Sequence, residues 1–425
     1  MADRLKVCHL STAESAGGAG RAARRLHKAF LDAGADSRLV VMLKTSDDPS
    51  VETPPKSIPY VLRKLTASYL DNVPLLLYGN RKRTKWSPGF VQVYPVDRLD
   101  CVRNADLIIL YWTCAGFLSI ETVRRLGKLG KPIFWRLSDM WPFTGGCHYS
   151  AGCDKYEDRC GSCPLLESSR QRDLSRRMWN RKQRKWKDIP FTVVCPSRWI
   201  ARCAKRSSLF GDKRVEVLST GIDTKVFRPM ARETCRALLG LPPGRKMALF
   251  GALDALSDPR KGSRYLEDAL IAYSRNKRNP PLDLVVFGTS RKPERLAEHF
   301  EIHVLGNLGD DVSLSLAYNA CDLFVAPSRE ENLANTVLES LACGTPCVAF
   351  DIGGMPDLIE HCVNGYLAKP FEVDELARGL GLILADGEEN GALRTRAVSK
   401  VQREFKQEDV CRRYLALYEE IASGA

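Results

Sequence analysis

The sequence lacks several features that would restrict where and how the protein acts. Residues 1–7 contain no apolar segment of the kind that a signal peptide needs, and no run in the chain approaches 18 apolar residues. We therefore expect a cytosolic chain. No internal repeat or low-complexity tract occurs. Without a secretory signal, the 15 cysteines are expected to be reduced thiols or metal ligands rather than disulfides.

The composition is that of an ordinary globular protein, with 44% hydrophobic and 27% charged residues. A length of 425 residues predicts two or three domains. The formal net charge of +13 favours an anionic partner, which could be a membrane surface, a nucleic acid or a phosphorylated substrate. The sign of the charge does not choose among these three.

Short apolar runs alternate with helical patterns along most of the chain. This βαβ alternation predicts parallel, doubly wound sheets. Helices are expected at 21–33, 120–129, 373–384 and 408–421. Strands are expected at 5–10, 37–42, 106–111, 132–137, 191–195, 215–218, 247–250, 283–288, 302–306, 323–326 and 346–350.

Residues 327–347 carry most of the functional inference. Glu331 falls in the loop after the strand at 323–326, and Glu339 falls one turn inside a helix that begins near Asn332 or Asn335. The first N–H groups of that helix, around Leu333, Ala334 and Asn335, would face an anion at this edge of the sheet. Taken alone, the two glutamates favour a capped helix with solvated carboxylates.

The loop at 11–20 is rich in small residues and contains Gly17 and Gly18 between a strand and a helix. This order of elements lets the backbone approach a phosphate, but the glycine spacing matches neither a dinucleotide fingerprint nor a P-loop. A tight connection without a ligand is the default interpretation of this loop by itself.

Four cysteines cluster within 17 positions and could form a metal centre. The last two are separated by two residues, a spacing typical of one half of a zinc knuckle. A structural zinc site is favoured over reduced, unliganded thiols, and a Cys₄ iron–sulfur cluster is a minor alternative. The four are Cys147, Cys153, Cys160 and Cys163.

Two segments are candidates for an anionic surface. Residues 168–188 contain nine Lys or Arg and two Asp, a net charge of +7, with Trp179 and Trp186 interleaved. Such a helix suits an anionic membrane or an acceptor phosphate, then a solvated face, then nucleic acid. Residues 51–89 mix apolar residues with a basic cluster, which suits either lipid headgroups or a solvated insertion.

The string Pro-Ser-x-x-Glu-Asn-Leu-x-Asn-Thr-Val-x-Glu-x-x-Ala-x-Gly-Thr-Pro from residue 327 resembles the nucleotide-sugar signature of retaining glycosyltransferase family 4. That family has the GT-B fold, in which two Rossmann-like α/β domains face a cleft. The block Asp-Met-Trp-Pro-Phe-Thr-Gly-Gly-Cys-His-Tyr from residue 139 resembles a subgroup associated with bacterial exopolysaccharide and lipopolysaccharide assembly.

The resemblance implies a division of the chain into domains. Residues 219–229 resemble the family's inter-domain linker. An N-terminal acceptor-side domain would cover 1–225, with the cysteine-rich insertion at 147–163 and the basic helix at 168–188. A nucleotide-sugar domain would cover 226–405. A final helix at 406–425 would cross back to the first domain.

The resemblance also implies roles for single residues. Glu331 would contact the donor sugar hydroxyls, and Glu339 the ribose. Lys261 would hold the donor diphosphate with Arg260, which we expect to replace the family's arginine at Ala252. Asp139 would act in catalysis, and Gly17 and Gly18 would line the donor side. Tyr111 and Ser138 stand where the family commonly has histidines, which would remove two imidazoles from the cleft.

The expected activity is transfer of a hexose from a UDP- or GDP-sugar to a glycan acceptor with retention of configuration, without a catalytic divalent cation. The acceptor would be lipid-linked or an oligosaccharide in surface polysaccharide biosynthesis, and the enzyme would be peripheral on the inner face of the cytoplasmic membrane. A nucleotide-sugar epimerase is one alternative. A basic metal-knuckle protein that binds nucleic acid is another, although no nucleic-acid motif is present, and a catalytically silent partner subunit is a third.

Overall fold

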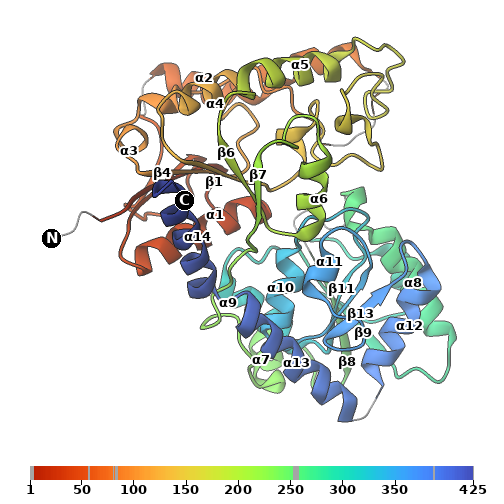
Figure 1. Cartoon of the computed structure of the whole chain (residues 1–425). Helices are drawn as coiled ribbons and strands as arrows, with labels where there is room; N and C mark the ends of the chain where they lie inside the picture. Colours follow the sequence, from red (N-terminus) through yellow and green to blue (C-terminus); the bar gives the residue numbers. More distant parts are fainter. Residues whose placement is uncertain are drawn as a thin grey trace. The chain divides into compact units, whose positions relative to one another are not determined.

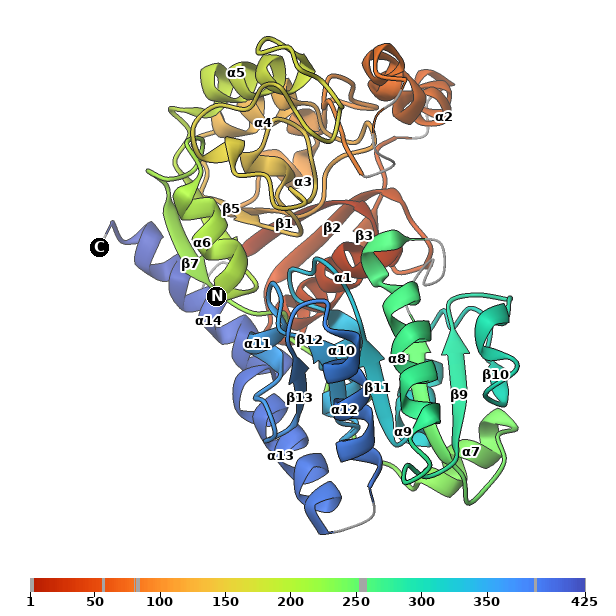
Figure 2. The same cartoon turned by 90° about the vertical axis from the view of Figure 1, so that its right-hand side faces the viewer.

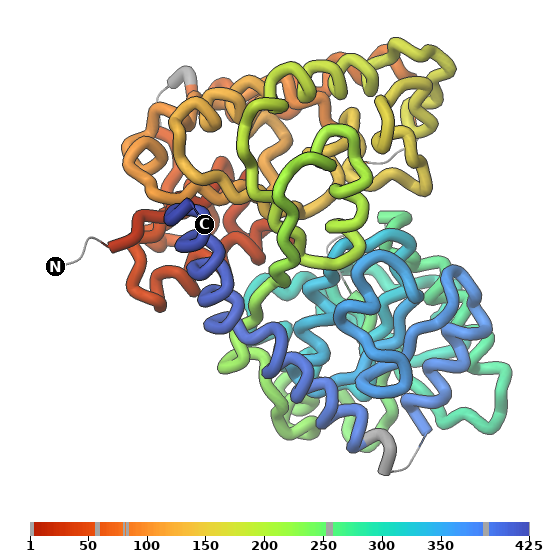
Figure 3. The backbone as a smooth tube through the Cα atoms, viewed as in Figure 1, coloured from red at the N-terminus to blue at the C-terminus, as the bar shows by residue number. Residues whose placement is uncertain are grey.

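The computed structural model describes residues 4–55, 58–79, 81, 85–251, 258–385 and 388–424. They form two compact units (Figure 1). Unit 1 contains Met1–Ser219 and Val410–Ala425, and unit 2 contains Thr220–Asp409. In the tube of Figure 3, the blue C-terminal end of the chain lies beside the red N-terminal elements of unit 1.

Unit 1 is built on a parallel sheet of seven strands in the order β3-β2-β1-β4-β5-β6-β7. Most of these strands are short runs of buried apolar residues, as expected for a sheet that is covered on both faces. Their bounds are β1 Lys6–Ala13, β2 Asp36–Leu43, β3 Val51–Glu52, β4 Leu107–Leu110, β5 Ile133–Arg136, β6 Phe191–Cys195 and β7 Arg214–Val217.

Helices cover both faces of this sheet (Figure 2). On one face, α1 and α14 pack around Phe30 and Tyr414, and on the other face α2, α4, α5 and α6 share a larger core. The helices of unit 1 are α1 Gly17–Asp32, α2 Ile58–Asn72, α3 Asp100–Arg103, α4 Ile120–Gly127, α5 Leu174–Trp186, α6 Arg198–Arg206 and α14 Gln407–Ala422, with 3-10 turns η1 Val73–Leu77, η2 Val96–Arg98, η3 Trp141–Phe143 and η4 Lys155–Glu157.

Unit 2 has a parallel sheet of six strands in the order β10-β9-β8-β11-β12-β13. The strands are β8 Lys246–Gly251, β9 Leu282–Phe287, β10 Ile302–Val304, β11 Leu323–Ala326, β12 Cys347–Phe350 and β13 Gly365–Ala368. The helices are α7 Arg232–Leu239, α8 Ser263–Arg275, α9 Asp311–Ala320, α10 Asn335–Ala342, α11 Met355–Leu358, α12 Val373–Leu384 and α13 Glu388–Glu404, with 3-10 turns η5 Pro259–Lys261 and η6 Glu294–Leu296.

The prediction of two parallel, doubly wound sheets is confirmed. The sequence pattern did not predict α13, whose polar residues leave only a few apolar positions, such as Ala397 and Val401, to face the core. In the described part of the chain, no helix is long and apolar enough to cross a membrane.

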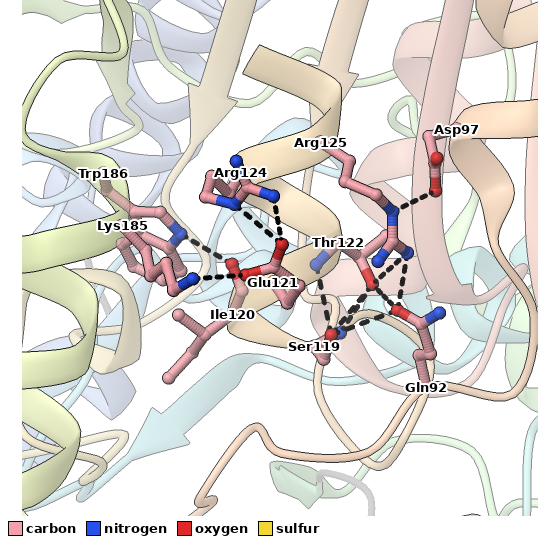
Figure 4. A network of polar contacts seen from close by, with 10 residues as sticks. All are labelled: Gln92, Asp97, Ser119, Ile120, Glu121, Thr122, Arg124, Arg125, Lys185 and Trp186. Carbon is pink, nitrogen blue, oxygen red and sulfur yellow. Dashed lines mark hydrogen bonds and ion pairs between the residues drawn. The ribbon is translucent and has the colours of Figure 1, made fainter. Parts of the chain in front are cut away.

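The basic helix α5 is attached to α4 by a polar network (Figure 4). Lys185 pairs with Glu121 at 3.0 Å, and the indole N–H of Trp186 donates to the carbonyl of Ile120 at 2.9 Å. The rings of Trp179 and Trp186 are buried. The interpretation of these tryptophans as membrane-interface residues was therefore wrong, because both are needed in the core under α5.

Candidate functional site

The order of the strands in unit 2 reverses between β8 and β11, which are neighbours at the centre of the sheet. In open parallel sheets, ligands bind outside the carboxyl ends of the strands at such a reversal. Lys261 follows β8 and Glu331 follows β11. The topology therefore brings two residues that are 70 positions apart to one edge.

The loop that carries Lys261 is held against β11 by backbone contacts. The carbonyl of Arg260 accepts a hydrogen bond of 2.7 Å from the N–H of Arg329. Gly262 has φ +72°, and a Cβ at this position would lie 1.8 Å from the carbonyl oxygen of Pro327. Only glycine combines this conformation with this approach, so the backbone itself requires a glycine at position 262.

Lys261 and Glu331 form an ion pair, with Nζ 2.7 Å from Oε2. Their side chains are 24% and 11% exposed, so the pair is mostly enclosed and one face of it reaches solvent. The carbonyl of Glu331 accepts from the N–H of Gly354 at 3.1 Å, and a Cβ on Gly353 would lie 2.0 Å from that carbonyl. Two glycines therefore fix the backbone that carries the carboxylate.

Arg260, the other predicted diphosphate ligand, is paired with Asp258 at 2.6 Å. Burial raises the pKa of the Asp258 carboxyl, but the charge of Arg260 and its hydrogen bonds outweigh this and hold the pKa below its usual value. A diphosphate would therefore compete with Asp258 for this guanidinium. Ala252 lies outside the described residues.

Helix α10 begins at Asn335, with Ala334 at the N-cap and no side chain that caps the first turn. The helix therefore begins at one of the two predicted positions, with Ala334 as its N-cap residue. Asn332, Leu333 and Ala334 are buried and form the turn between Glu331 and the helix. Backbone N–H groups at a helix N-terminus are suited to bind an anion.

Glu339 is 1% exposed and accepts a hydrogen bond of 2.9 Å from the hydroxyl of Tyr318 on α9. Tyr318 was not predicted from the sequence as a partner of Glu339. The only signal for it in the sequence was a tyrosine among small and apolar residues, in a segment for which no helix was predicted. Since a buried carboxylate needs hydrogen-bond partners, Tyr318 is a positioning residue for Glu339.

In unit 1, α1 begins at Gly17, which has φ +70°, and Gly18 follows in its first turn. Glu14 precedes this turn and is fully buried, and its carboxylate accepts from the N–H groups of Thr45 at 2.7 Å and Ser46 at 2.9 Å. Glu14 therefore ties the glycine turn to the end of β2. Sequence reasoning did not identify this residue.

Asp139, at the end of β5, belongs to a buried polar network. One carboxylate oxygen accepts from the N–H of Trp141 at 2.9 Å, and the other lies 2.5 Å from Nδ1 of His148. Nε2 of His148 lies 2.9 Å from the hydroxyl of Ser87. The imidazole of His148, from the Gly-Gly-Cys-His-Tyr segment, therefore contacts Asp139. This contact was not predicted from the sequence.

The expectation for Tyr111 needs a correction. Tyr111 is 2% exposed and lies in the core shared with α1 and α14, where its hydroxyl is 2.9 Å from Nδ1 of His9. A residue at position 111 therefore faces the packed side of the sheet. Tyr111 is therefore part of the core of unit 1.

The predicted metal centre is not formed in this structure. Cys147, Cys153, Cys160 and Cys163 line one pocket, but the described residues contain no group of three or more His, Cys, Asp or Glu that could hold a metal ion. Burial raises the pKa of Cys160 to about 12 and that of Cys147 well above its usual value, which keeps these thiols neutral. The Sγ of Cys160 accepts from the N–H of Gly145 at 3.1 Å.

The predicted site residues divide between the units. Gly17, Gly18 and Asp139 lie in unit 1, whereas Arg260, Lys261 and the residues from 331 to 339 lie in unit 2. The contacts described above join the first three residues to other residues of unit 1, and those of the second group to other residues of unit 2.

Comparison with solved structures supports the fold. HepE of Anabaena, solved in complex with UDP-glucose, superposes with a TM-score of 0.64 at 17% identity and covers 99% of this chain and 100% of that one. WaaG, a glycosyltransferase involved in lipopolysaccharide biosynthesis, gives a TM-score of 0.60 at 16% identity over 95% of this chain and 98% of that one. The fold is therefore GT-B, with two Rossmann-like units.

Sequence comparison covers part of the chain. A D-inositol 3-phosphate glycosyltransferase of Mycobacterium marinum is 29% identical over 218 residues, which cover 48% of this chain. The chain spans about half the length of the curated relatives it matches, 45% in this case. Residues 245–386 match the family model described as "Glycosyl transferases group 1", so unit 2 contains a group 1 glycosyltransferase domain.

Proposed function

We propose that the protein is a retaining glycosyltransferase that moves a hexose from a UDP- or GDP-sugar to a glycan acceptor. The observation that carries the proposal is the Lys261–Glu331 pair, which lies at the strand-order reversal of a group 1 glycosyltransferase domain. The acceptor is a lipid-linked glycan of surface polysaccharide biosynthesis, and the enzyme works at the inner face of the cytoplasmic membrane.

In this mechanism, the bond between the anomeric carbon and the diphosphate oxygen breaks through an oxocarbenium-like transition state. Lys261 and the N–H groups at the start of α10 stabilise the charge that develops on the leaving diphosphate. The acceptor hydroxyl attacks the same face of the sugar, and its proton passes to the diphosphate. Glu331 accepts hydrogen bonds from the sugar hydroxyls, and Glu339 accepts them from the ribose.

Unit 1 supplies the acceptor side in this proposal. The contact with His148 and the hydrogen bond from Trp141 hold the Asp139 carboxylate in one orientation. Gly17 and Gly18 give the backbone access to the donor at the start of α1. A carboxylate and exposed backbone suit hydroxyl-rich ligands, which both donate and accept hydrogen bonds.

The test is a turnover assay with purified protein, UDP- and GDP-sugars and glycan acceptors, with the anomeric configuration of the product read by NMR. Transfer with retention that is lost in Glu331→Gln is the expected result. The matched control is Arg295→Met, which breaks an exposed ion pair with Glu267 in the same unit. Conversion of the donor without any acceptor would instead assign the site to an epimerase, and an inverted product would overturn the mechanism.

A further inference from the structure

The second helix of unit 1 presents an apolar surface to solvent. Six large side chains on α2 and η1 are each at least half exposed, and Leu77 reaches 85%. We call this the α2–η1 surface. Its residues are Leu62, Leu65, Tyr69, Leu70, Leu76 and Leu77. Single exposed leucines are common on proteins, but six within 16 positions form a patch of the kind that marks an interaction site.

This surface belongs to a helix that is firmly attached to unit 1. Tyr60, Ala67 and Leu75 are buried in the core on the opposite side. The buried carboxylate of Asp71 accepts hydrogen bonds from the N–H groups of Phe90 at 2.7 Å and of Val91 at 3.0 Å. Because these contacts fix the helix, the six exposed side chains have a defined direction.

The charged side chains of this segment that reach solvent are cations. Between residues 60 and 79, the ionisable residues other than tyrosine are Arg63, Lys64 and Asp71. Of these, Asp71 is buried. Arg63 is exposed and Lys64 is partly exposed, and Arg81 and Lys85 follow in the chain. An apolar strip bordered by cations fits an anionic lipid bilayer. Two copies of this chain would bring like charges together.

Helix α5 adds cations on the same face of the sheet as α2 (Figures 1 and 2). The start of α5 is tied to the end of η1, because the N–H of Leu174 donates to the hydroxyl of Tyr78 at 2.9 Å. Arg177, Arg184 and Lys187 are exposed along the helix. Since its tryptophans are buried, α5 can supply charge to a membrane but not an apolar anchor.

We propose that the α2–η1 surface inserts into an anionic lipid bilayer and that it is the element by which unit 1 docks on the membrane. The inference deepens the proposed function, on which it rests, because a lipid-linked acceptor requires the enzyme to reach the membrane. The six side chains would enter the boundary between headgroups and acyl chains, and the cations would contact lipid phosphates.

The experiment is co-flotation of the full chain with vesicles of phosphatidylcholine alone or with 30% phosphatidylglycerol. We expect binding to the anionic vesicles that weakens with salt. Leu65→Ser combined with Leu77→Ser should weaken binding at least about tenfold, because two leucine side chains no longer enter the apolar part of the bilayer. The matched control is Leu238→Ser, which changes a leucine that is 67% exposed on α7.

Binding that is equal in the wild type and the double variant, or no binding to anionic vesicles, would overturn the inference. A dimer in light scattering that the double variant abolishes would assign the surface to a second copy instead. Nucleotide binding is measured in parallel without lipid. If vesicles bind and no UDP or GDP binds, the docking surface stands and the proposed function fails; the reverse result removes the docking surface alone.

Discussion

The Lys261–Glu331 pair allows a prediction in which two variants have the same effect on stability but different effects on nucleotide binding. Both side chains are less than one third exposed and their charged atoms are 2.7 Å apart. Removal of either partner leaves a mostly buried charge without its counter-ion, so Lys261→Met and Glu331→Gln should each lower the free energy of unfolding of unit 2. A double-mutant cycle should give a coupling energy of about 1–2 kcal/mol, between the values typical of exposed and fully buried pairs.

Binding of UDP or GDP, measured by calorimetry, should respond differently to the same two variants. Lys261→Met removes a charged donor to the diphosphate, which should weaken binding about tenfold to a hundredfold. Glu331→Gln releases Lys261 from its partner, so the affinity for the free nucleotide should be unchanged or higher, whereas transfer is lost. Unchanged nucleotide binding in Lys261→Met would refute the assignment of the diphosphate to this loop. A coupling energy near zero, found together with weaker nucleotide binding in Glu331→Gln, would refute the same assignment.

Three other changes test separate parts of the structure. In Gly262→Ala, the new Cβ would meet the Pro327 carbonyl. The free energy of unfolding in urea should fall by at least about 2 kcal/mol, and nucleotide binding should be lost. Normal nucleotide binding would contradict this packing. Tyr318→Phe removes the hydrogen bond to Glu339, so it should lower the free energy of unfolding of unit 2 by about 1–2 kcal/mol and raise the Kd for UDP. The stability of unit 1 should not change. Burial lowers the pKa of His27 to about 4, so the unfolded chain binds its proton more tightly and stability falls as pH drops from 6.5 to 4. His27→Gln should flatten that part of the denaturation profile, and an unchanged slope would show that other groups dominate.

The sequence predicted the sheets well because their strands are runs of buried apolar residues. The stretch at 323–326 became β11 with the predicted bounds, and Glu331 follows it in a loop. The ion pair with Lys261 could not be predicted, because it depends on which strands are neighbours. The pattern of local residues predicted most strands, although not β3 and β13, and it does not give the order β9-β8-β11 that brings the two loops together.

Other predictions failed because they depended on how side chains pack, which the sequence does not show. Trp179 and Trp186 sit among basic residues in the sequence, and local charge gives no sign that one face of this helix is buried. The four clustered cysteines have the spacing of a metal site, but their geometry depends on the fold of the whole 144–166 loop region. The exposure of Leu65 and Leu77 is also invisible in a sequence, where an exposed apolar stripe and a core stripe look the same.

The packing of α14 has a consequence for how the chain can be made and divided. Tyr414 is fully buried in unit 1, with its ring 6.5 Å from that of Phe30 and 6.4 Å from that of Phe134. Unit 2 is one continuous segment, Thr220–Asp409, whereas unit 1 needs both ends of the chain. Unit 2 can therefore be excised without dividing its own segment, whereas unit 1 would be left in two pieces. During synthesis on the ribosome, the core of unit 1 is completed only after unit 2 has emerged in full.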